Sequence, residues 1–113
     1  MSKKLEINVS RNGASTVLGI GGVLDSASSW QLLEALRAQF KQGEQDRVVL
    51  DFQGVDSIDS SGIASLVEGL YEAKTRNLRL ILTGLNEPAR ERLAMTLLTR
   101  VFEITRTVEE ALR

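Results

Sequence analysis

Apolar residues recur along this chain with two periods, every second residue in some segments and about every 3.6 residues in others, which are typical of strands and helices respectively. The first segment has the shorter period. Residues 5–9 alternate between apolar and polar side chains, as a half-buried β-strand does. Arg11-Asn12-Gly13 follows, and an Asn-Gly pair favours a tight hairpin turn with positive φ angles. Residues 16–20 are then expected to return beside the first strand. The sequence therefore predicts an N-terminal antiparallel β-hairpin.

Two longer segments carry the helical period, and each is expected to turn one face towards a core. Residues 27–41 place these apolar side chains on the expected core face: Trp30, Leu33, Leu36 and Phe40. Residues 61–76 do the same with Ile63, Leu66, Val67, Leu70 and Tyr71. Asp25 or Ser26 is the expected N-cap of the first helix, and Gly43 is its expected end. Asn77 is expected to close the second helix in the left-handed conformation.

The other segments complete an alternation of strands and helices. Residues 47–52 and 78–83 are apolar at consecutive positions, which is typical of strands covered on both faces. Asn86 and Pro88 open a third helix, and residues 101–104 read as a short edge strand. Thr107-Val108-Glu109-Glu110 has the form of a capping box, which predicts a last helical stretch at 108–112. Gly21 and Gly22 match no phosphate-binding motif and are interpreted as a strand end or bulge.

The predicted order is β-β-α-β-α-β-α-β-α, which indicates an α/β fold. A hairpin that leads into strand–helix alternation forms a small mixed β-sheet with helices and right-handed crossovers. The 113 residues contain no linker, repeat or low-complexity tract, so we expect one domain over residues 1–113.

Composition removes several classes of function. The formal charge of −1 argues against nucleic-acid binding through a basic face. With no Cys and no His, the chain has no thiol nucleophile, no Ser-His triad and none of the usual zinc ligands. We therefore expect no enzyme activity, no cofactor and no metal. The chain has no apolar run near the roughly 20 residues that span a bilayer, and its start does not resemble a signal peptide, so a cytoplasmic location without membrane insertion is expected.

The segment Asp59-Ser60-Ser61-Gly62 is the main candidate site, because it joins a buried strand to a periodic helix. One interpretation is that Ser60 or Ser61 is only an N-cap, worth roughly 1 kcal/mol. A functional interpretation is supported by Gly62, which costs up to roughly 1 kcal/mol in a helix and is expected where another group must approach the backbone. Two small, unshielded hydroxyls stand beside the carboxylates of Asp56 and Asp59.

Several of these segments together resemble a STAS domain, and most closely the bacterial anti-sigma factor antagonists. The similarity covers nearly the whole chain and rests on these stretches: Gly22-Val23-Leu24-Asp25, residues 49–52 and 55–63, Val101-Phe102-Glu103-Ile104 and Glu109-Glu110-Ala111-Leu112. The Asp-Ser-Ser-Gly segment is its most specific part. One departure lies at residues 95–99, which lack the glycine that such families often carry before the late strand.

The resemblance implies a switch between partners. By motif position, Ser60 is the residue that an ATP-dependent anti-sigma factor serine kinase phosphorylates and a PP2C-type phosphatase restores. The unphosphorylated form is expected to bind the anti-sigma factor and so release sigma. The residues implied in partner docking are Asp25, Asp59, Ser61, Gly62 and Ile63. The free protein is expected to be a monomer.

Three alternatives were weighed against this hypothesis. A receiver domain would use Asp51, but the opening hairpin and the missing acidic pair after the first strand disagree with it. A metal-dependent hydrolase could use Asp51, Asp56 and Asp59, although solvated loop carboxylates are the simpler interpretation. The third alternative keeps the fold and changes the function: a STAS scaffold or docking subunit that does not act on sigma, such as a stressosome-like component or a lipid-transport ATPase subunit.

Overall fold

The computed structural model describes residues 4–96 and 100–113. Its strands are β1 (Glu6–Asn12), β2 (Ser15–Leu24), β3 (Arg47–Ile58), β4 (Arg79–Thr83) and β5 (Glu103–Thr105). Its helices are α1 (Ser29–Phe40), α2 (Ser60–Thr75), α3 (Glu87–Met95) and α4 (Val108–Ala111). The element order is therefore the predicted one. Part of the departure from the family pattern at 95–99 lies outside the described residues.

The strands form one mixed sheet in the order β1-β2-β3-β4-β5. The hairpin strands β1 and β2 are antiparallel, and every later neighbouring pair is parallel. The hairpin turns through Gly13, whose φ of 61° is one that glycine adopts without strain. Because β2 and β3 are parallel neighbours with Leu24 opposite Ile58, the loops that follow them leave the same edge of the sheet. This edge brings Asp25 and Asp59 to the same end of the molecule.

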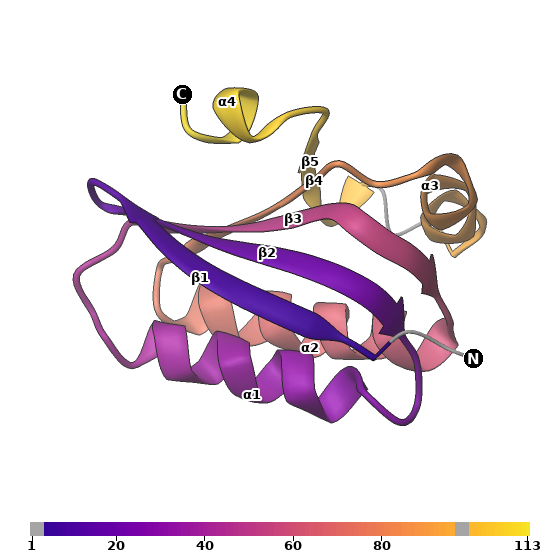
Figure 1. The fold of residues 1–113 in the computed structure, drawn as a ribbon. Helices are drawn as coiled ribbons and strands as arrows, with labels where there is room; N and C mark the ends of the chain where they lie inside the picture. Colours follow the sequence, from indigo (N-terminus) through magenta and orange to yellow (C-terminus); the bar gives the residue numbers. More distant parts are fainter. Residues whose placement is uncertain (1–3, 97–99) are drawn as a thin grey trace.

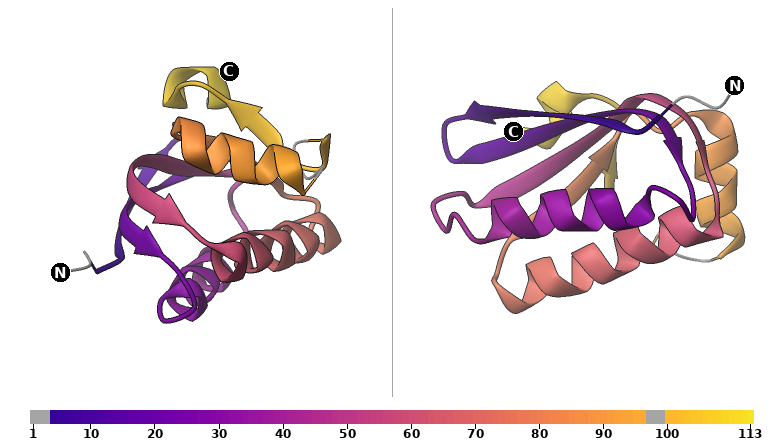
Figure 2. Two further views of the ribbon diagram at one scale, coloured as in Figure 1. Left: turned by 90° about the vertical axis from the view of Figure 1, so that its right-hand side faces the viewer. Right: turned by 60° about the horizontal axis from the view of Figure 1, so that its bottom comes forward.

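The helices cover the two faces of the sheet unequally (Figure 1). Helices α1 and α2 lie side by side across one face, α4 lies over the other face, and α3 lies near the end of β3. Figure 2 shows the same layers from two further directions. The main core fills the space between the sheet and the helix pair, with fully buried Leu18, Leu36, Leu50 and Leu66. A small cluster of Val49, Ile81 and Ala111 packs under α4.

Three predicted core positions were wrong. Trp30, Val67 and Tyr71 are exposed, and the exposed fractions of Trp30 and Tyr71 are 62% and 72%. The helical period was read correctly, but two helices that lie side by side bury only the faces turned to the sheet and to each other. The buried stripe of each helix is therefore turned about the helix axis relative to the predicted apolar face. In α1 that stripe is Leu32, Leu33, Leu36 and Phe40.

Several strand boundaries also differ from the prediction, and β3 runs to Ile58 although it was expected to end at residue 52. β2 continues through its glycines to Leu24, and its pairing with β3 shifts register between Gly19 and Gly21 and again after Gly22. Each shift places one extra residue in β3, so the irregularity expected at Gly21 and Gly22 is present, but the extra residues belong to the neighbouring strand and β2 does not end at the glycines. The last strand begins at Glu103 rather than at residue 101, because Phe102 is buried in the core from a turn.

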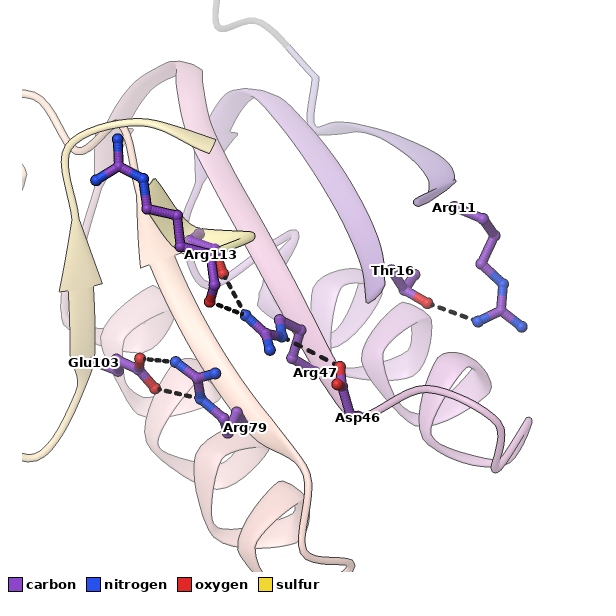
Figure 3. A network of polar contacts seen from close by, with 8 residues as sticks. Arg11, Thr16, Asp46, Arg47, Arg79, Glu103 and Arg113 are labelled. Atoms are coloured by element: carbon purple, nitrogen blue, oxygen red, sulfur yellow. Dashed lines mark hydrogen bonds and ion pairs between the residues drawn. The ribbon is translucent and has the colours of Figure 1, made fainter. Parts of the chain in front are cut away.

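Two arginines join the C-terminal segment of the chain to the central strands (Figure 3). The Nη1 of Arg47 donates to the backbone oxygens of Ala111 (3.1 Å) and Arg113 (2.8 Å). Arg79 on β4 forms an ion pair with Glu103 on β5, and the hydrogen bonds that Arg79 donates to the Glu103 carboxylate raise the pKa of Arg79. These contacts hold β5 and α4 against the central strands. Asn77 has the predicted left-handed φ (57°), and Thr107 Oγ1 accepts from the Glu110 N–H as predicted for a cap.

Candidate functional site

The candidate site begins where β3 leaves the sheet and α2 starts. Asp59 has extended backbone angles, and its Oδ1 accepts a hydrogen bond from the Gly62 N–H at 2.9 Å. Its own N–H donates to the carbonyl of Leu24 at the end of β2 (3.1 Å). Asp59 is therefore the N-cap of α2, and the interpretation of Ser60 or Ser61 as the cap was wrong. The bond to Leu24 fixes Asp59 outside the helix and places both serines in the first turn.

Gly62 allows α2 to approach the end of β2 closely. A Cβ on Gly62 would lie 2.8 Å from the Leu24 carbonyl oxygen and 2.8 Å from Ile58 Cγ2. These distances are shorter than side-chain Cβ atoms tolerate, so the glycine is required by packing. The group that approaches this bare backbone is the chain's own strand end. Gly62 is buried, and Ile63 beside it is only 5% exposed.

Ser60 lies on the surface at this rigid helix start. Its side chain is exposed, and among the described residues its hydroxyl makes no hydrogen bond. Ser61 is half-buried. By contrast, Ser65 one turn later is buried and donates its hydroxyl to the Gly62 carbonyl at 2.7 Å. Of the three serines, Ser60 has the hydroxyl that is most accessible to another molecule.

A groove of about 380 Å³ runs between α2 and α3 beside Ser60. Its walls are formed by Ser60, Ile63, Ala64, Val67, Arg92 and Thr96. The wall from α2 is mostly apolar, whereas α3 contributes a guanidinium and a hydroxyl. The right-hand view of Figure 2 draws α3 next to the first turns of α2, in agreement with this lining. The groove could receive an apolar side chain of a partner next to the serine.

Asp25 lies in the neighbouring loop between β2 and α1, where it forms a local turn instead of capping the helix. Its Oδ1 accepts hydrogen bonds from the Ala27 N–H (3.0 Å) and the Ser28 hydroxyl (3.1 Å), which form a local turn. The expected capping by Asp25 or Ser26 was wrong, because α1 starts later and its N-cap is Ser28. Asp25 also lines a separate hollow of about 420 Å³ together with Lys4 and Gln31.

The acidic residues of the region are not arranged as a metal site. Within residues 4–96 and 100–113, no three Asp, Glu, His or Cys side chains lie close enough to hold a metal ion. Asp51 instead accepts a hydrogen bond from the Gln53 N–H (3.0 Å). The structure therefore does not bring Asp51, Asp56 and Asp59 together as the hydrolase alternative requires. The antiparallel pairing of β1 and β2 likewise excludes a receiver-type βαβ start.

The sequence did not identify the residues that α3 contributes. Asn86 was predicted as a cap, and its Oδ1 does accept from the Ala89 N–H (3.0 Å). Its Nδ2 also donates to the carbonyl of Val55 (3.3 Å), so α3 is anchored to the end of β3. This anchor brings Arg92 and Thr96 to the groove. The burial of Ala89 and Leu93 marks which side of α3 faces the core, but no motif marks its position over α2.

Solved structures of similar fold include several regulators. An anti-sigma factor antagonist from Mycobacterium paratuberculosis aligns with a TM-score of 0.88 and 18% identity, over 99% of this chain and 96% of that one. An anti-sigma-factor antagonist (STAS) domain protein from Planctomyces limnophilus has a TM-score of 0.82 and 26% identity, over 94% of both chains. The Bacillus cell fate determinant SpoIIAA in its phosphorylated form has a TM-score of 0.72 and 20% identity, over 95% of this chain and 96% of that one.

The family comparison agrees with the fold. The family model described as "Mlab, STAS domain" matches residues 7–106, which include the sheet except for Glu6, and the α2–α3 groove. The rest of the hairpin, the parallel strands and the Asp-Ser-Ser-Gly helix start lie in the matched range. The chain therefore belongs to the STAS domain family.

Proposed function

We propose that this protein is an anti-sigma factor antagonist that exchanges partners when Ser60 is phosphorylated. The observation that carries the proposal is the exposed Ser60 hydroxyl, which has no hydrogen bond among the described residues and stands beside an open groove. In the unphosphorylated form, this surface binds an anti-sigma factor that is also a serine kinase, and sigma is released. A regulatory role of this kind is consistent with solved structures of similar fold that are anti-sigma factor antagonists.

The proposed chemistry takes place on this chain, and the catalytic groups belong to the partners. The kinase transfers the γ-phosphoryl group of ATP to Ser60 Oγ, the hydroxyl proton is lost and ADP leaves. A PP2C-type phosphatase then hydrolyses the phosphate ester, which restores the hydroxyl and releases inorganic phosphate. The protein is a substrate in both steps and needs no cofactor of its own. Since its proposed partners regulate transcription, we place the protein in the cytoplasm. We also propose that it is a monomer when free.

A phosphate at Ser60 is expected to change binding more than folding. It adds about −1.5 to −2 charges at the first turn of α2, where the helix N-terminus stabilises anions by roughly 0.3–2 kcal/mol. The carboxylates of Asp59 and Asp56 oppose it by about 1 kcal/mol each in water. The two effects nearly cancel within the domain. The added charge and bulk act instead on a partner docked at Asp25, Asp59 and Ser61.

Gly62 and Ile63 contribute to the proposed docking surface in a different way. Both residues are buried, so Gly62 supports the loop from below while Ile63 forms part of the groove wall. A partner would contact the surface that Gly62 and Ile63 support, and Ser60 lies at the edge of that surface. The sequence motif therefore combines exposed residues with buried ones that hold them in place.

The first experiment identifies the phosphorylated residue. The protein is incubated with ATP and the serine kinase encoded near its gene, and the phosphate is located by mass spectrometry. Modification of Ser60, and its absence in a Ser60→Ala variant, is the expected result. Modification of Ser61 alone, or no modification by the neighbouring kinase, would contradict the proposal.

The second experiment measures the affinity for the anti-sigma factor. Calorimetry should show that Ser60→Asp weakens binding to the anti-sigma factor by about 1–3 kcal/mol, the usual range of a coupling energy. Ser10→Asp is the matched control and should bind as the wild type does, because Ser10 is exposed and lies on β1 towards the hairpin turn, away from the sheet edge that carries the docking loops. If both variants bind as the wild type does, Ser60 is not part of the docking surface.

A second candidate function is a STAS scaffold or docking subunit that does not act on sigma. It is favoured by the matched family model, whose description names Mlab and no sigma regulator. Purification of the tagged protein from its own cells distinguishes the candidates. Recovery of a serine kinase supports the sigma switch, whereas recovery of a transporter ATPase or a large STAS assembly supports the docking role.

A further inference from the structure

We infer that Arg92 on α3 binds the phosphoryl group at Ser60 within the same molecule. This inference rests on the phosphorylation of Ser60 proposed above and adds a specific residue to it. Arg92 and Ser60 line opposite sides of the groove between α2 and α3. A phosphate on Ser60 would therefore join the two helices across the groove.

The guanidinium of Arg92 has no other partner in the part of the chain that the structure describes. The ion pairs there involve Arg37, Arg47 and Arg79, and the side-chain hydrogen bonds likewise leave Arg92 without a partner. Arg92 is also the one titratable side chain among the described residues that line the groove. The other described lining residues offer Arg92 no competing anion, and a guanidinium binds phosphate through charge-assisted hydrogen bonds, so a phosphate on Ser60 would be a strong ligand for it.

The other charged side chains near Ser60 are carboxylates, which are negative like the phosphate. Asp59 caps the helix immediately before Ser60, and Asp56 lies in the same segment. Without a cation, a dianion at Ser60 would meet two carboxylates and the partial charge of one helix end. These effects nearly cancel, so Arg92 adds a net attraction, and a guanidinium can donate two parallel hydrogen bonds to a phosphate.

The position of Arg92 also distinguishes the two serines. Ser60 lines the groove, whereas Ser61 is half-buried and does not line it. A phosphate at position 61 would lack this partner. Once Arg92 binds the phosphate, the pair covers the groove, so phosphorylation removes an apolar docking surface as well as adding charge.

The test uses the full chain with phosphoserine incorporated at position 60 during translation, so no kinase is needed. Phosphorus NMR gives the second pKa of the phosphate, which is ordinarily about 6. Arg92→Gln is expected to raise this pKa by about half a unit or more, because a nearby cation favours the dianion. Arg92→Lys keeps the charge without the paired donors and should give an intermediate value.

Two controls separate a specific contact from a general effect of charge. Arg90→Gln removes the same charge from the same helix, but Arg90 lines a different hollow with Thr105 and Arg106. It should shift the pKa by less than about 0.2 units, as expected for a screened and more distant charge. Phosphoserine at position 61 should respond to neither substitution.

Equal shifts from Arg92→Gln and Arg90→Gln, or no shift from either, would overturn the inference about Arg92. Neither result bears on whether a kinase modifies Ser60, because the phosphate is installed without one. Conversely, a failure of the kinase experiment leaves this measurement intact. Both arginines are exposed, and backbone NMR spectra of each variant verify that the fold is kept.

Discussion

Two neighbouring loops of this domain have similar sequences but position their serines differently. The first joins β2 to α1 through Asp25-Ser26-Ala27-Ser28-Ser29, and the second joins β3 to α2 through Asp59-Ser60-Ser61. Both leave the same edge of the sheet, and both contain an aspartate whose Oδ1 accepts a backbone N–H. In the first loop, Asp25 accepts from a residue two positions ahead. In the second, Asp59 accepts from a residue three positions ahead and caps the helix directly.

The difference decides which hydroxyl is available. Ser28 in the first loop donates its hydroxyl to the Val23 carbonyl at 2.9 Å and accepts from the Asp25 N–H. Its hydrogen-bonding capacity is used to hold the turn. Ser60 is the first residue of α2. Its side chain is exposed, and its hydroxyl makes no hydrogen bond to the described residues. The second loop thus presents its serine on the first turn of a helix, whereas the exposed Ser26 beside Asp25 lies in a turn before the helix.

The largest expected effect on stability comes from filling the space at Gly62, where the start of α2 contacts the end of β2. Gly62→Ala should lower the free energy of unfolding by about 1–3 kcal/mol, the usual cost of overpacking, because the new methyl group would meet the Leu24 carbonyl. Chemical denaturation measures the change. The carbonyl belongs to the paired end of β2 and has little room to move.

Gly69→Ala is the matched control in the same helix. A Cβ there would meet Leu36 Cδ1 at 2.7 Å, the end of a flexible side chain. Alanine also gains up to about 1 kcal/mol of helix propensity over glycine. We expect Gly69→Ala to change stability much less than Gly62→Ala. Equal costs would mean that the junction between β2 and α2 is not the rigid part of the site.

The second prediction compares the two aspartates. Asp59→Ala should destabilise the protein by about 1 kcal/mol, since it removes an N-cap. Asp25→Ala should cost about 0.5 kcal/mol, the low end for a hydrogen bond, because one of its two bonds is to an exposed N–H. Thermal unfolding of the two variants under one buffer condition provides the comparison. A larger cost for Asp25→Ala would reverse the contrast between the loops.

The predicted fold came from local patterns that the structure confirms, and the errors came from contacts distant in sequence. The start of α2 was predicted within one residue. Its cap was wrong because Asp, Ser and Gly at consecutive positions offer several cap geometries of similar energy. The bond between the Asp59 N–H and the Leu24 carbonyl selects one of them. Such a bond depends on strand register, which the local pattern does not contain.

The groove was missed for a similar reason. Its α3 wall depends on where that helix lies, and Asn86 fixes this through a hydrogen bond to the carbonyl of Val55, thirty-one positions earlier. The local role of Asn86 as a cap was predicted, but its second role was not. Trp30 and Tyr71 show the same limit, because a period reveals that a helix has an apolar face without revealing which part of its circumference the neighbours cover.

The smallest expected effect tests the far part of the helix pair, away from both loops. Arg37 on α1 forms ion pairs with Glu72 (2.9 Å) and Glu68 (3.4 Å) on α2. The hydrogen bond from Arg37 lowers the pKa of Glu72 below its ordinary value of 4.5. A carboxyl whose pKa is lower in the folded state stabilises the fold above its unfolded pKa, and this contribution is lost as the pH falls through the folded pKa.

Glu72→Gln should therefore lower the melting temperature slightly at pH 7, and by less than Asp59→Ala does, because the ion pair is largely exposed to solvent. The difference from the wild type should persist down to about pH 4.5 and shrink below it, where the wild-type carboxyl also becomes neutral. Added salt should reduce the difference at pH 7 through screening. A difference that is constant from pH 7 to pH 3 would show that Glu72 acts through packing rather than charge. Packing of the apolar faces, and not the charge of Glu72, would then hold this part of the helix pair together.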